Sequence, residues 1–267
     1  MGDNIFEIQN LSVDVFDMAR KPIIGAAPRL EILKDITFNI QHRDVIGIVG
    51  GSGSGKSTLG RAMLRLIEPS GGKIVFEGKD ITDLNESELR PLRRKFQMIF
   101  QDPMSSLNPR HRVAAIIGGP LKLHGFARVD FLIEEALDHV GLPKSFKFRY
   151  PHELSGGQRQ RIGIARAIAV KPNFILADEI VSGLDVSSQA KILSLLQKLV
   201  IDLGLTLAFI SHDLSVVRRL SNKIIVLKEG ALIESSLTKK LFETPEHPYT
   251  EELLAAIPLP DPRQVWE

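Results

Sequence analysis

The chain has 267 residues, of which 43% are hydrophobic and 25% charged, with 34 basic against 32 acidic side chains. These proportions are typical of an ordinary globular protein and exclude an intrinsically disordered chain. The absence of cysteine excludes a disulfide scaffold, a thiolate metal site and a thiol nucleophile, and it fits a reducing compartment. The net charge of +2 gives no indication of a nucleic-acid partner.

No stretch of the sequence reaches the roughly eighteen consecutive apolar residues that a membrane-spanning helix needs. The first residues also lack the basic and apolar regions of a signal peptide. We therefore expect a chain that is made in the cytosol and stays there.

The first two predicted strands, residues 5–16 and 30–40, alternate apolar and polar residues as half-buried strands do, which predicts a mostly antiparallel opening. Three later runs are apolar and β-branched throughout, as in fully buried parallel strands: residues 45–49, 174–177 and 207–210. Each of these runs precedes a predicted helix. Alternation of buried strands with helices predicts an α/β sheet, in which ligands bind beyond the carboxyl ends of the strands.

The middle and the end of the chain are predicted to be helical. A helical insertion is expected over about residues 103–165, because apolar side chains recur there at helical spacing and no strand pattern is evident. After Gly230, repeated prolines indicate a short helical appendage over residues 237–257 and a loose end. We therefore expect one domain over residues 1–257 and a short C-terminal tail over residues 237–267.

Residues 50–58 read GGSGSGKST and match the phosphate-binding pattern G-x-x-x-x-G-K-S/T between a buried strand and an amphipathic run. Glycine tolerates positive φ, so successive N–H groups can converge on phosphate oxygens, and the helix N-terminus adds partial positive charge. Lys56 is expected to reach the β- and γ-phosphates, and the Ser57 hydroxyl to bind Mg²⁺. The alternative, a glycine-rich turn without a ligand, leaves the preceding strand and the Lys-Ser pair unexplained. The residues expected to hold the nucleotide are Gly50, Gly51, Ser52, Gly53, Ser54, Gly55, Lys56, Ser57 and Thr58.

Two adjacent carboxylates, Asp178 and Glu179, follow the buried strand at residues 174–177. At the carboxyl end of such a strand, Asp178 can hold the magnesium shell, and Glu179 can orient or deprotonate the attacking water. Taken alone, the pair could equally be solvated loop charges. The phosphate-binding loop upstream favours the functional interpretation.

Two more polar residues end strands that are predicted to reach the same edge of the sheet. His212 follows the strand at residues 207–210, and Gln101 ends a short run at residues 97–101. A neutral amide at position 101 can contact both magnesium and the attacking water, so movement of the helical insertion would be felt there. The predicted metal ligands are Ser57, Gln101 and Asp178, and the predicted catalytic residues are Glu179, His212 and Gln101.

Residues 154–158, LSGGQ, form a second glycine-rich loop at the start of a helix predicted over residues 158–170. Ser155 is well placed as the helix cap, and the free N–H groups suit an anion. No lysine and no strand accompany this loop, so it is not a second independent nucleotide site. Over about residues 5–257 the chain resembles the ATP-binding cassettes of ABC transporters, for which LSGGQ is the signature.

The resemblance implies a P-loop NTPase core of RecA-like topology with an antiparallel β subdomain and a helical insertion subdomain. It also implies ATP and Mg²⁺ as cofactors and a dimer, in which the signature of one subunit closes over the γ-phosphate held by the other. The further nucleotide contacts that it implies are Ser155, Gly156, Gly157, Gln158 and Asp185.

Three other features follow from the same resemblance. The family stacks adenine on an aromatic side chain of the first hairpin. Val15 and Phe16 straddle that register, so Phe16 is the candidate, with a core position as the alternative. Asp185 belongs to the segment that resembles the family's D-loop, residues 182–185. Ile180 and Gly183 stand where proline and alanine are common, but neither removes a catalytic atom, so we expect full hydrolytic competence.

Three separated segments resemble the branch of oligopeptide, dipeptide and nickel importers: residues 100–110, 150–153 and 246–250. The likeness implies an ATP-hydrolysing translocase subunit on the cytoplasmic face of the inner membrane, driving uptake of peptides or alternatively of nickel, an opine or glutathione. It implies two integral membrane permease subunits, an ATPase partner that is a paralogue or a second copy, and a periplasmic solute-binding protein. The chain looks more like the second ATPase of such a pair, in a short-tailed form without iron–sulfur cysteines.

An ABC ATPase that acts on nucleic acid or the ribosome is the rival hypothesis. Repair-type members of the family carry zinc cysteines, chromosome-type members long coiled coils, and translation-type members two cassettes in one chain. The sequence has none of these features, so we expect no nucleic-acid partner. A P-loop kinase would leave LSGGQ unexplained.

Overall fold

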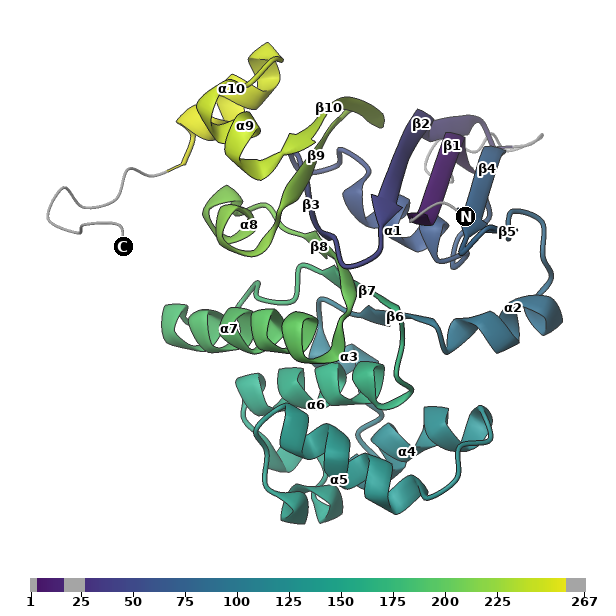
Figure 1. The fold of residues 1–267 in the computed structure, drawn as a ribbon, viewed down its shortest axis with the longest axis vertical. Helices are drawn as coiled ribbons and strands as arrows, with labels where there is room; N and C mark the ends of the chain where they lie inside the picture. Colours follow the sequence, from purple (N-terminus) through teal and green to yellow (C-terminus); the bar gives the residue numbers. More distant parts are fainter. Residues whose placement is uncertain (1–3, 17–26, 258–267) are drawn as a thin grey trace, which may run out of the picture.

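The computed structural model describes residues 4–16 and 27–257, which form two β-sheets and a body of helices (Figure 1). The first sheet is antiparallel, with the strand order β2-β1-β4-β5. This confirms the predicted antiparallel opening and adds β4 and β5, which the sequence analysis did not identify. The strands of this sheet are β1 (Asn4–Phe16), β2 (Arg29–Gln41), β4 (Gly71–Phe76) and β5 (Lys79–Asp80).

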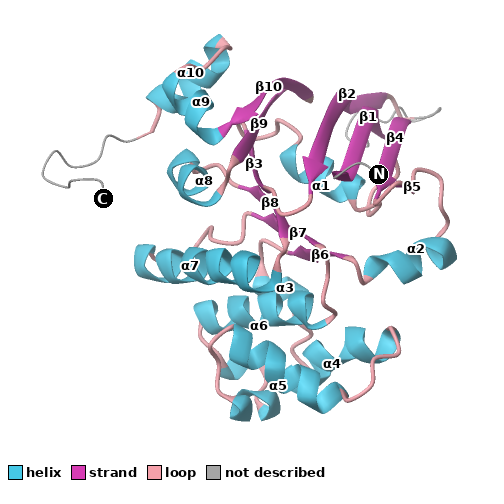
Figure 2. Cartoon of the chain, viewed as in Figure 1, coloured by secondary structure: helices cyan, strands magenta, loops and turns pink. Residues whose placement is uncertain are grey.

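The second sheet has the strand order β10-β9-β3-β8-β7-β6 and is parallel from β9 to β6. Its strands are β3 (Val45–Val49), β6 (Phe96–Ile99), β7 (Phe174–Asp178), β8 (Thr206–Ile210), β9 (Lys223–Lys228) and β10 (Ala231–Leu237). The three predicted buried strands are neighbours in it, as β3, β8 and β7 (Figure 2). Their carboxyl ends therefore meet at one edge, together with that of β6.

Both faces of this parallel sheet are buried, and β7 shows how. Phe174 and Leu176 belong to a core that β7 shares with the antiparallel sheet, whereas Ile175 and Ala177 belong to a second core on the helical side. Successive side chains point to opposite faces of a strand, so a strand covered on both faces is apolar throughout. This explains why the sequence pattern identified β7 without any alternation.

Four phenylalanine rings join the two sheets. The Phe6 ring centroid lies 4.9 Å from that of Phe76 and 4.8 Å from that of Phe174, and Phe76 and Phe96 are 5.0 Å apart. Tilted and edge-to-face pairs at such distances add to the free energy gained from burial alone. Helix α1 (Lys56–Met63), which follows β3, buries its apolar side chains in the same core.

Helices fill the predicted insertion, and within the described residues no strand interrupts it between β6 and β7 (Figure 2). They are α3 (Pro103–Ser106), α4 (Val113–Leu123), α5 (Val129–His139) and α6 (Gly156–Ala169), with 3₁₀ turns at Lys144–Phe148 and Pro151–Glu153. The remaining helices are α2 (Glu86–Arg93), α7 (Val186–Leu203), α8 (Leu214–Leu220), α9 (Thr238–Glu243) and α10 (Pro248–Ala255). The predicted C-terminal appendage is thus two short helices. No helix in the described part of the chain has the length and hydropathy to cross a membrane.

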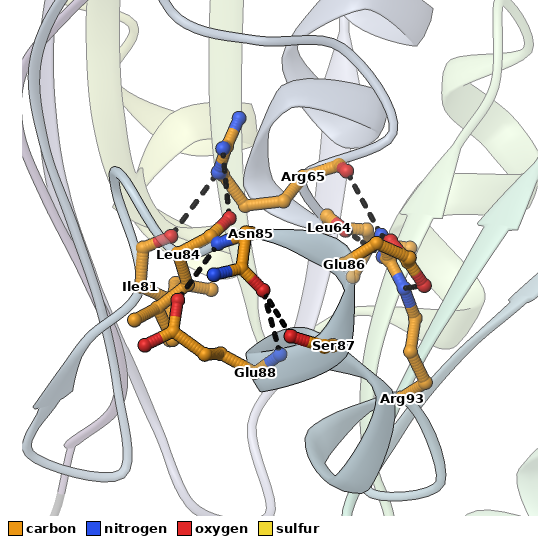
Figure 3. Close-up of polar contacts among 9 residues, drawn as sticks. All are labelled: Leu64, Arg65, Ile81, Leu84, Asn85, Glu86, Ser87, Glu88 and Arg93. Atoms are coloured by element: carbon orange, nitrogen blue, oxygen red, sulfur yellow. Dashed lines mark hydrogen bonds and ion pairs between the residues drawn. The ribbon is translucent and has the colours of Figure 1, made fainter.

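The far end of α1 is tied to α2 by an arginine (Figure 3). The Arg93 guanidinium donates to the carbonyls of Leu64 and Arg65, at 2.5 and 3.1 Å, and pairs with Glu86 at 2.8 Å. These carbonyls directly follow the last turn of α1, so the positive charge lies near the helix C-terminus and complements the helix dipole. Arg93 immediately precedes the turn into β6, and it therefore connects the helix behind the phosphate-binding loop to the strand that leads to Gln101.

Candidate nucleotide site

The phosphate-binding loop joins β3 to α1, as the sequence predicts. Gly50 and Gly55 have φ angles of 148° and 97°, which side-chain-bearing residues rarely adopt. A Cβ on Gly50 would also stand 2.2 Å from the carbonyl oxygen of Leu227. The loop conformation therefore depends on glycine at these positions. Helix α1 begins directly after the loop turn, at Lys56.

Lys56 is a buried cation held by its own loop. Its side chain is 6% exposed, and its ammonium donates to the carbonyl oxygens of Gly50 and Gly51, at 2.9 and 2.8 Å. Burial lowers the pKa of Lys56, and the nearby charges of Glu179 and Asp178 oppose that shift. Two of the three ammonium protons are satisfied by neutral carbonyls, which leaves a donor and a positive charge for an anion such as phosphate.

Ser57 and Asp178 meet although they are far apart in the chain. The Ser57 hydroxyl donates to an Asp178 carboxylate oxygen at 2.9 Å, and the Arg61 guanidinium lies 3.8 Å from the other oxygen. Asp178 is 1% exposed; burial raises its pKa, against the opposing effects of Ser57 and Arg61. A hydroxyl and a carboxylate are oxygen ligands of the kind that Mg²⁺ prefers, with phosphate and water completing its shell. The donor set of these two residues therefore fits magnesium.

Glu179, Gln101 and His212 converge at the carboxyl ends of β7, β6 and β8. The Gln101 amide nitrogen donates to a Glu179 carboxylate oxygen at 3.2 Å, and His212 Nδ1 lies 3.8 Å from the same oxygen. The Glu179 backbone has φ of 46°, and its N–H donates to the Ile210 carbonyl at 3.0 Å. That bond ties the residue to the end of β8, so its carboxylate is presented beyond the sheet. The expected meeting of strand ends is thus observed for these side chains, with the Gln101 amide against Glu179.

The signature loop caps its helix as predicted, with the helix beginning at Gly156. The Ser155 hydroxyl accepts from the Gln158 N–H at 3.3 Å, and the Gln158 side-chain oxygen accepts from the Ser155 N–H at 3.0 Å. This reciprocal capping box satisfies two donors at the helix start. The loop borders a surface hollow of about 690 Å³ that Asp185 also lines and that no residue of the phosphate-binding loop lines.

Asp185 caps α7. Its carboxylate accepts from the Ser188 N–H and from the hydroxyls of Ser187 and Ser188, at 3.0, 2.8 and 2.7 Å. These hydrogen bonds, those from Ser188 first, hold the pKa of Asp185 well below its usual range. The carboxylate is therefore engaged by its own helix, and its expected contact with nucleotide stays a prediction.

Phe16 lies at the end of β1 and is 58% exposed, which excludes the alternative of a core position. The guanidinium carbon of Arg29 lies 5.7 Å from its ring centroid. An exposed ring is compatible with stacking on a base, and that role stays a prediction.

Two contacts of the site were not anticipated from the sequence. Arg61 approaches Asp178 from α1, and Tyr249 of α10 accepts a hydrogen bond from the Gly51 N–H at 2.8 Å. In the sequence, Tyr249 is marked only by belonging to a segment that resembles one branch of importers. No sequence spacing could reveal a partner 198 positions away.

Comparison with known proteins gives consistent matches. A family model described as ABC transporter matches residues 33–182. The chain is 50% identical over 236 residues to a Brucella ovis protein named for peptide import, with 87% of this chain and 74% of that protein covered. It is 48% identical over 242 residues to the oligopeptide transport ATP-binding protein OppF of Streptococcus mutans, covering 89% and 79%. With the glutathione import ATP-binding protein GsiA of Salmonella paratyphi A it shares 43% identity over 264 residues, which is 98% of this chain but 42% of that protein.

Solved structures agree with the fold. The ATP-binding cassette MJ0796, described as a dimer in a post-hydrolysis state bound to ADP and Pi, superposes with a TM-score of 0.76 at 30% identity, covering 87% of this chain and 98% of that one. The cassette cbiO1 from Clostridium perfringens, part of the transporter complex cbiONQ, gives 0.77 at 28% identity, covering 91% and 93%. The chain therefore has the fold of these cassettes.

Proposed function

Since this chain belongs to the ABC transporter family, we propose that it is the ATPase subunit of an importer and hydrolyses MgATP to drive uptake of peptides. One observation carries the hydrolytic part of the proposal. Glu179, Gln101 and His212 meet at the ends of three neighbouring strands. The pair formed by Ser57 and Asp178 lies at the same edge of the sheet, with Ser57 after the loop that follows β3 and Asp178 at the end of β7.

Each group has a distinct task in this proposal. The Lys56 ammonium and the N–H groups of residues 50–58, apart from that of Gly51, which donates to Tyr249, bind the phosphates. Ser57 and Asp178 hold Mg²⁺. The metal, when bound, neutralises phosphate charge and polarises the phosphoryl group. Glu179 orients the attacking water and takes up its proton, while Gln101 and His212 hold the carboxylate in place.

The signature loop supports a dimeric enzyme. The loop borders an open hollow that no residue of the phosphate-binding loop lines, which supports a nucleotide supplied by a second chain. The related cassette MJ0796 is described as a dimer. We propose that Ser155, Gly156, Gly157, Gln158 and Asp185 meet the nucleotide held by a second copy or by a paralogue.

The solute and the partners are proposed from the relatives. Two of them are named for peptides and one for glutathione, so a peptide-like solute is favoured over nickel or an opine. A subunit of such an importer would lie on the cytoplasmic face of the membrane beneath two permease subunits, with a solute-binding protein acting on their far side. We propose one ATPase domain over residues 1–257, with the helical insertion at about 103–165 and the tail at 237–267.

The test of hydrolysis is Glu179→Gln. Turnover should fall by about 10²- to 10⁴-fold, because the amide cannot take up the proton of the attacking water. Affinity for MgATP should stay within about threefold, and an ATP-dependent dimer should accumulate in light scattering. Glu229→Gln is the matched control, since Glu229 is also a glutamate with positive φ just after a strand, but is exposed and is not one of the three residues that meet at Glu179. Near-normal turnover of Glu179→Gln would sink the proposed role.

The test of the partners is purification of the tagged chain from its native membranes, followed by mass spectrometry. The importer proposal expects two integral membrane proteins and an ATPase subunit in the recovered complex. Recovery with DNA or ribosomes instead would contradict it and favour a nucleic-acid-linked ATPase.

A further inference from the structure

The C-terminal segment reaches the phosphate-binding loop through one side chain. The Tyr249 hydroxyl accepts the Gly51 N–H at 2.8 Å, and its ring lies under the Lys228 ammonium, 4.6 Å from the ring centroid. A Cβ on Gly51 would stand 2.9 Å from the same hydroxyl. The end of β9, α10 and the loop are therefore in direct contact around Tyr249.

Helix α10 is anchored by a buried carboxylate. Glu234 of β10 is 6% exposed, and its side chain accepts from the N–H groups of Glu246 and His247, both at 3.1 Å, and from the Thr250 hydroxyl at 2.6 Å. A buried carboxylate that accepts three hydrogen bonds from one segment holds that segment firmly, because losing any of these donors leaves charge unsatisfied. Tyr249, between His247 and Thr250, is held by this anchor.

The peptide groups of Gly51 are held from two sides. Its N–H is bound by Tyr249, and its carbonyl accepts from the Lys56 ammonium at 2.8 Å. When Lys56 turns to a phosphate, its bond to this carbonyl competes with the phosphate for the same ammonium. The bond from Tyr249 does not compete, since it uses the N–H of Gly51. Tyr249 therefore holds the loop backbone in place when the Lys56 ammonium exchanges the Gly51 carbonyl for a phosphate.

We propose that Tyr249 is a positioning residue of the phosphate-binding loop, and that through it the docked C-terminal segment sets how tightly the loop binds ATP. The proposal rests on the function proposed above for its choice of ligand. In this proposal residues 246–250 act within the chain itself. Glu234 fixes the position of the segment, and Tyr249 of that segment fixes the position of Gly51.

The experiment is Tyr249→Phe in the full chain, with a fluorescent ATP analogue for affinity and steady-state hydrolysis for KM and kcat. Loss of one hydrogen bond should weaken binding and raise KM by about three- to tenfold. The kcat should stay within about twofold, because the contact is made equally before and during the reaction. Tyr150→Phe, at the chain's other tyrosine, is the matched control, since that hydroxyl contacts Arg112 at 3.3 Å in the helical insertion.

A double-mutant cycle isolates the contact. As a single substitution, Gly51→Ala should weaken ATP binding by a factor similar to that of Tyr249→Phe, because the new methyl group displaces the Tyr249 hydroxyl. In the Tyr249→Phe background the same change should have less than about a twofold effect, since no hydroxyl is left to meet. Additive effects of the two substitutions would contradict a direct coupling.

Amide hydrogen exchange without nucleotide separates this proposal from the proposed function. The Gly51 N–H should exchange faster in Tyr249→Phe than in the wild type. Its exchange rate in Tyr150→Phe should equal that of the wild type. A wild type that neither binds nor hydrolyses ATP overturns the proposed function, yet exchange at Gly51 still decides whether Tyr249 holds the loop. Wild-type exchange and wild-type ATP affinity in Tyr249→Phe would overturn the role of Tyr249.

Discussion

The two glycine-rich loops of this chain are built in opposite ways. The phosphate-binding loop is closed in by its own chain: Lys56 is buried, and a Cβ on Gly50 would collide with the Leu227 backbone. The signature loop lies open: Ser155 is exposed, and a Cβ on Gly156 would meet only a Leu184 methyl group at 3.9 Å. The folded chain itself encloses the phosphate-binding loop, whereas the signature loop borders an open hollow.

The two aspartates near these loops differ in the same way. Asp178 is buried and its pKa is raised, so its ionised form costs the fold free energy at neutral pH. Asp185 is satisfied by the start of its own helix and its pKa is lowered, so its ionised form stabilises the fold. The aspartate that lowers stability thus contacts the loop proposed to bind the nucleotide, and the aspartate that raises stability lies beside the loop proposed to meet a second chain.

The largest expected effect breaks the closed loop. Gly50→Ala should lower the free energy of unfolding by about 3 kcal/mol, because the new Cβ meets a backbone carbonyl in a conformation that alanine rarely adopts. Gly53→Ala is the control: it has φ of 75° but nothing near its Cβ, and should cost only about 1 kcal/mol. Urea titration measures both, and equal losses would show that the contact with Leu227 is unimportant.

A smaller effect of opposite sign is expected at Asp178. Asp178→Asn should raise the free energy of unfolding at neutral pH by about 1 kcal/mol while abolishing the effect of Mg²⁺ on ATP affinity. The folded-state pKa of Asp178 is raised, so the stability that this carboxyl contributes is full below its unfolded-state pKa of about 4. That stability is lost as pH rises through the folded-state pKa, so the gain from asparagine grows over the same range. Thermal melts in EDTA between pH 4 and 8 measure this, and a gain that shrinks with rising pH would contradict it.

Asp185→Ala supplies the contrast. It should lower the melting temperature at neutral pH, because the cap of α7 is lost. The folded-state pKa of Asp185 is depressed, so the stabilisation is present above about pH 4 and is lost as pH falls below it. The melting temperatures of this variant and the wild type should therefore converge in acid, and a difference that persists there would contradict the prediction.

The smallest change in stability is expected at the open loop. Gly156→Ala should alter the free energy of unfolding by no more than about 0.5 kcal/mol, since its Cβ has room. Hydrolysis should nevertheless fall about tenfold, because the methyl group stands on the face that a second chain would cover. Gly163→Ala, in the same helix with nothing near its Cβ, should leave hydrolysis unchanged. Equal activity of the two variants would argue that the signature loop meets no partner.

Much of the fold and site could be predicted from the sequence because their signals are local. The run at residues 174–177 followed by Asp178 and Glu179 identifies a buried strand and its end, and parallel strands bring such ends together. Strand β9 has the same apolar run, at residues 224–227, but β10 follows it instead of a helix. The strand–helix alternation therefore does not predict β9. The short antiparallel strands β4 and β5 carry too little pattern to be recognised.

The sequence alone determined which residues we propose to bind phosphate and metal, since a glycine-rich loop between a strand and a helix, with a lysine at its end, is the pattern of a phosphate-binding loop. Only the tertiary structure decided what surrounds them: that the Gln101 amide turns to Glu179, that Asp185 is occupied with its own helix, and that Tyr249 holds Gly51. The physical reason is distance along the chain. Conformational preferences act over a few residues, whereas these contacts exist only after packing brings distant segments together.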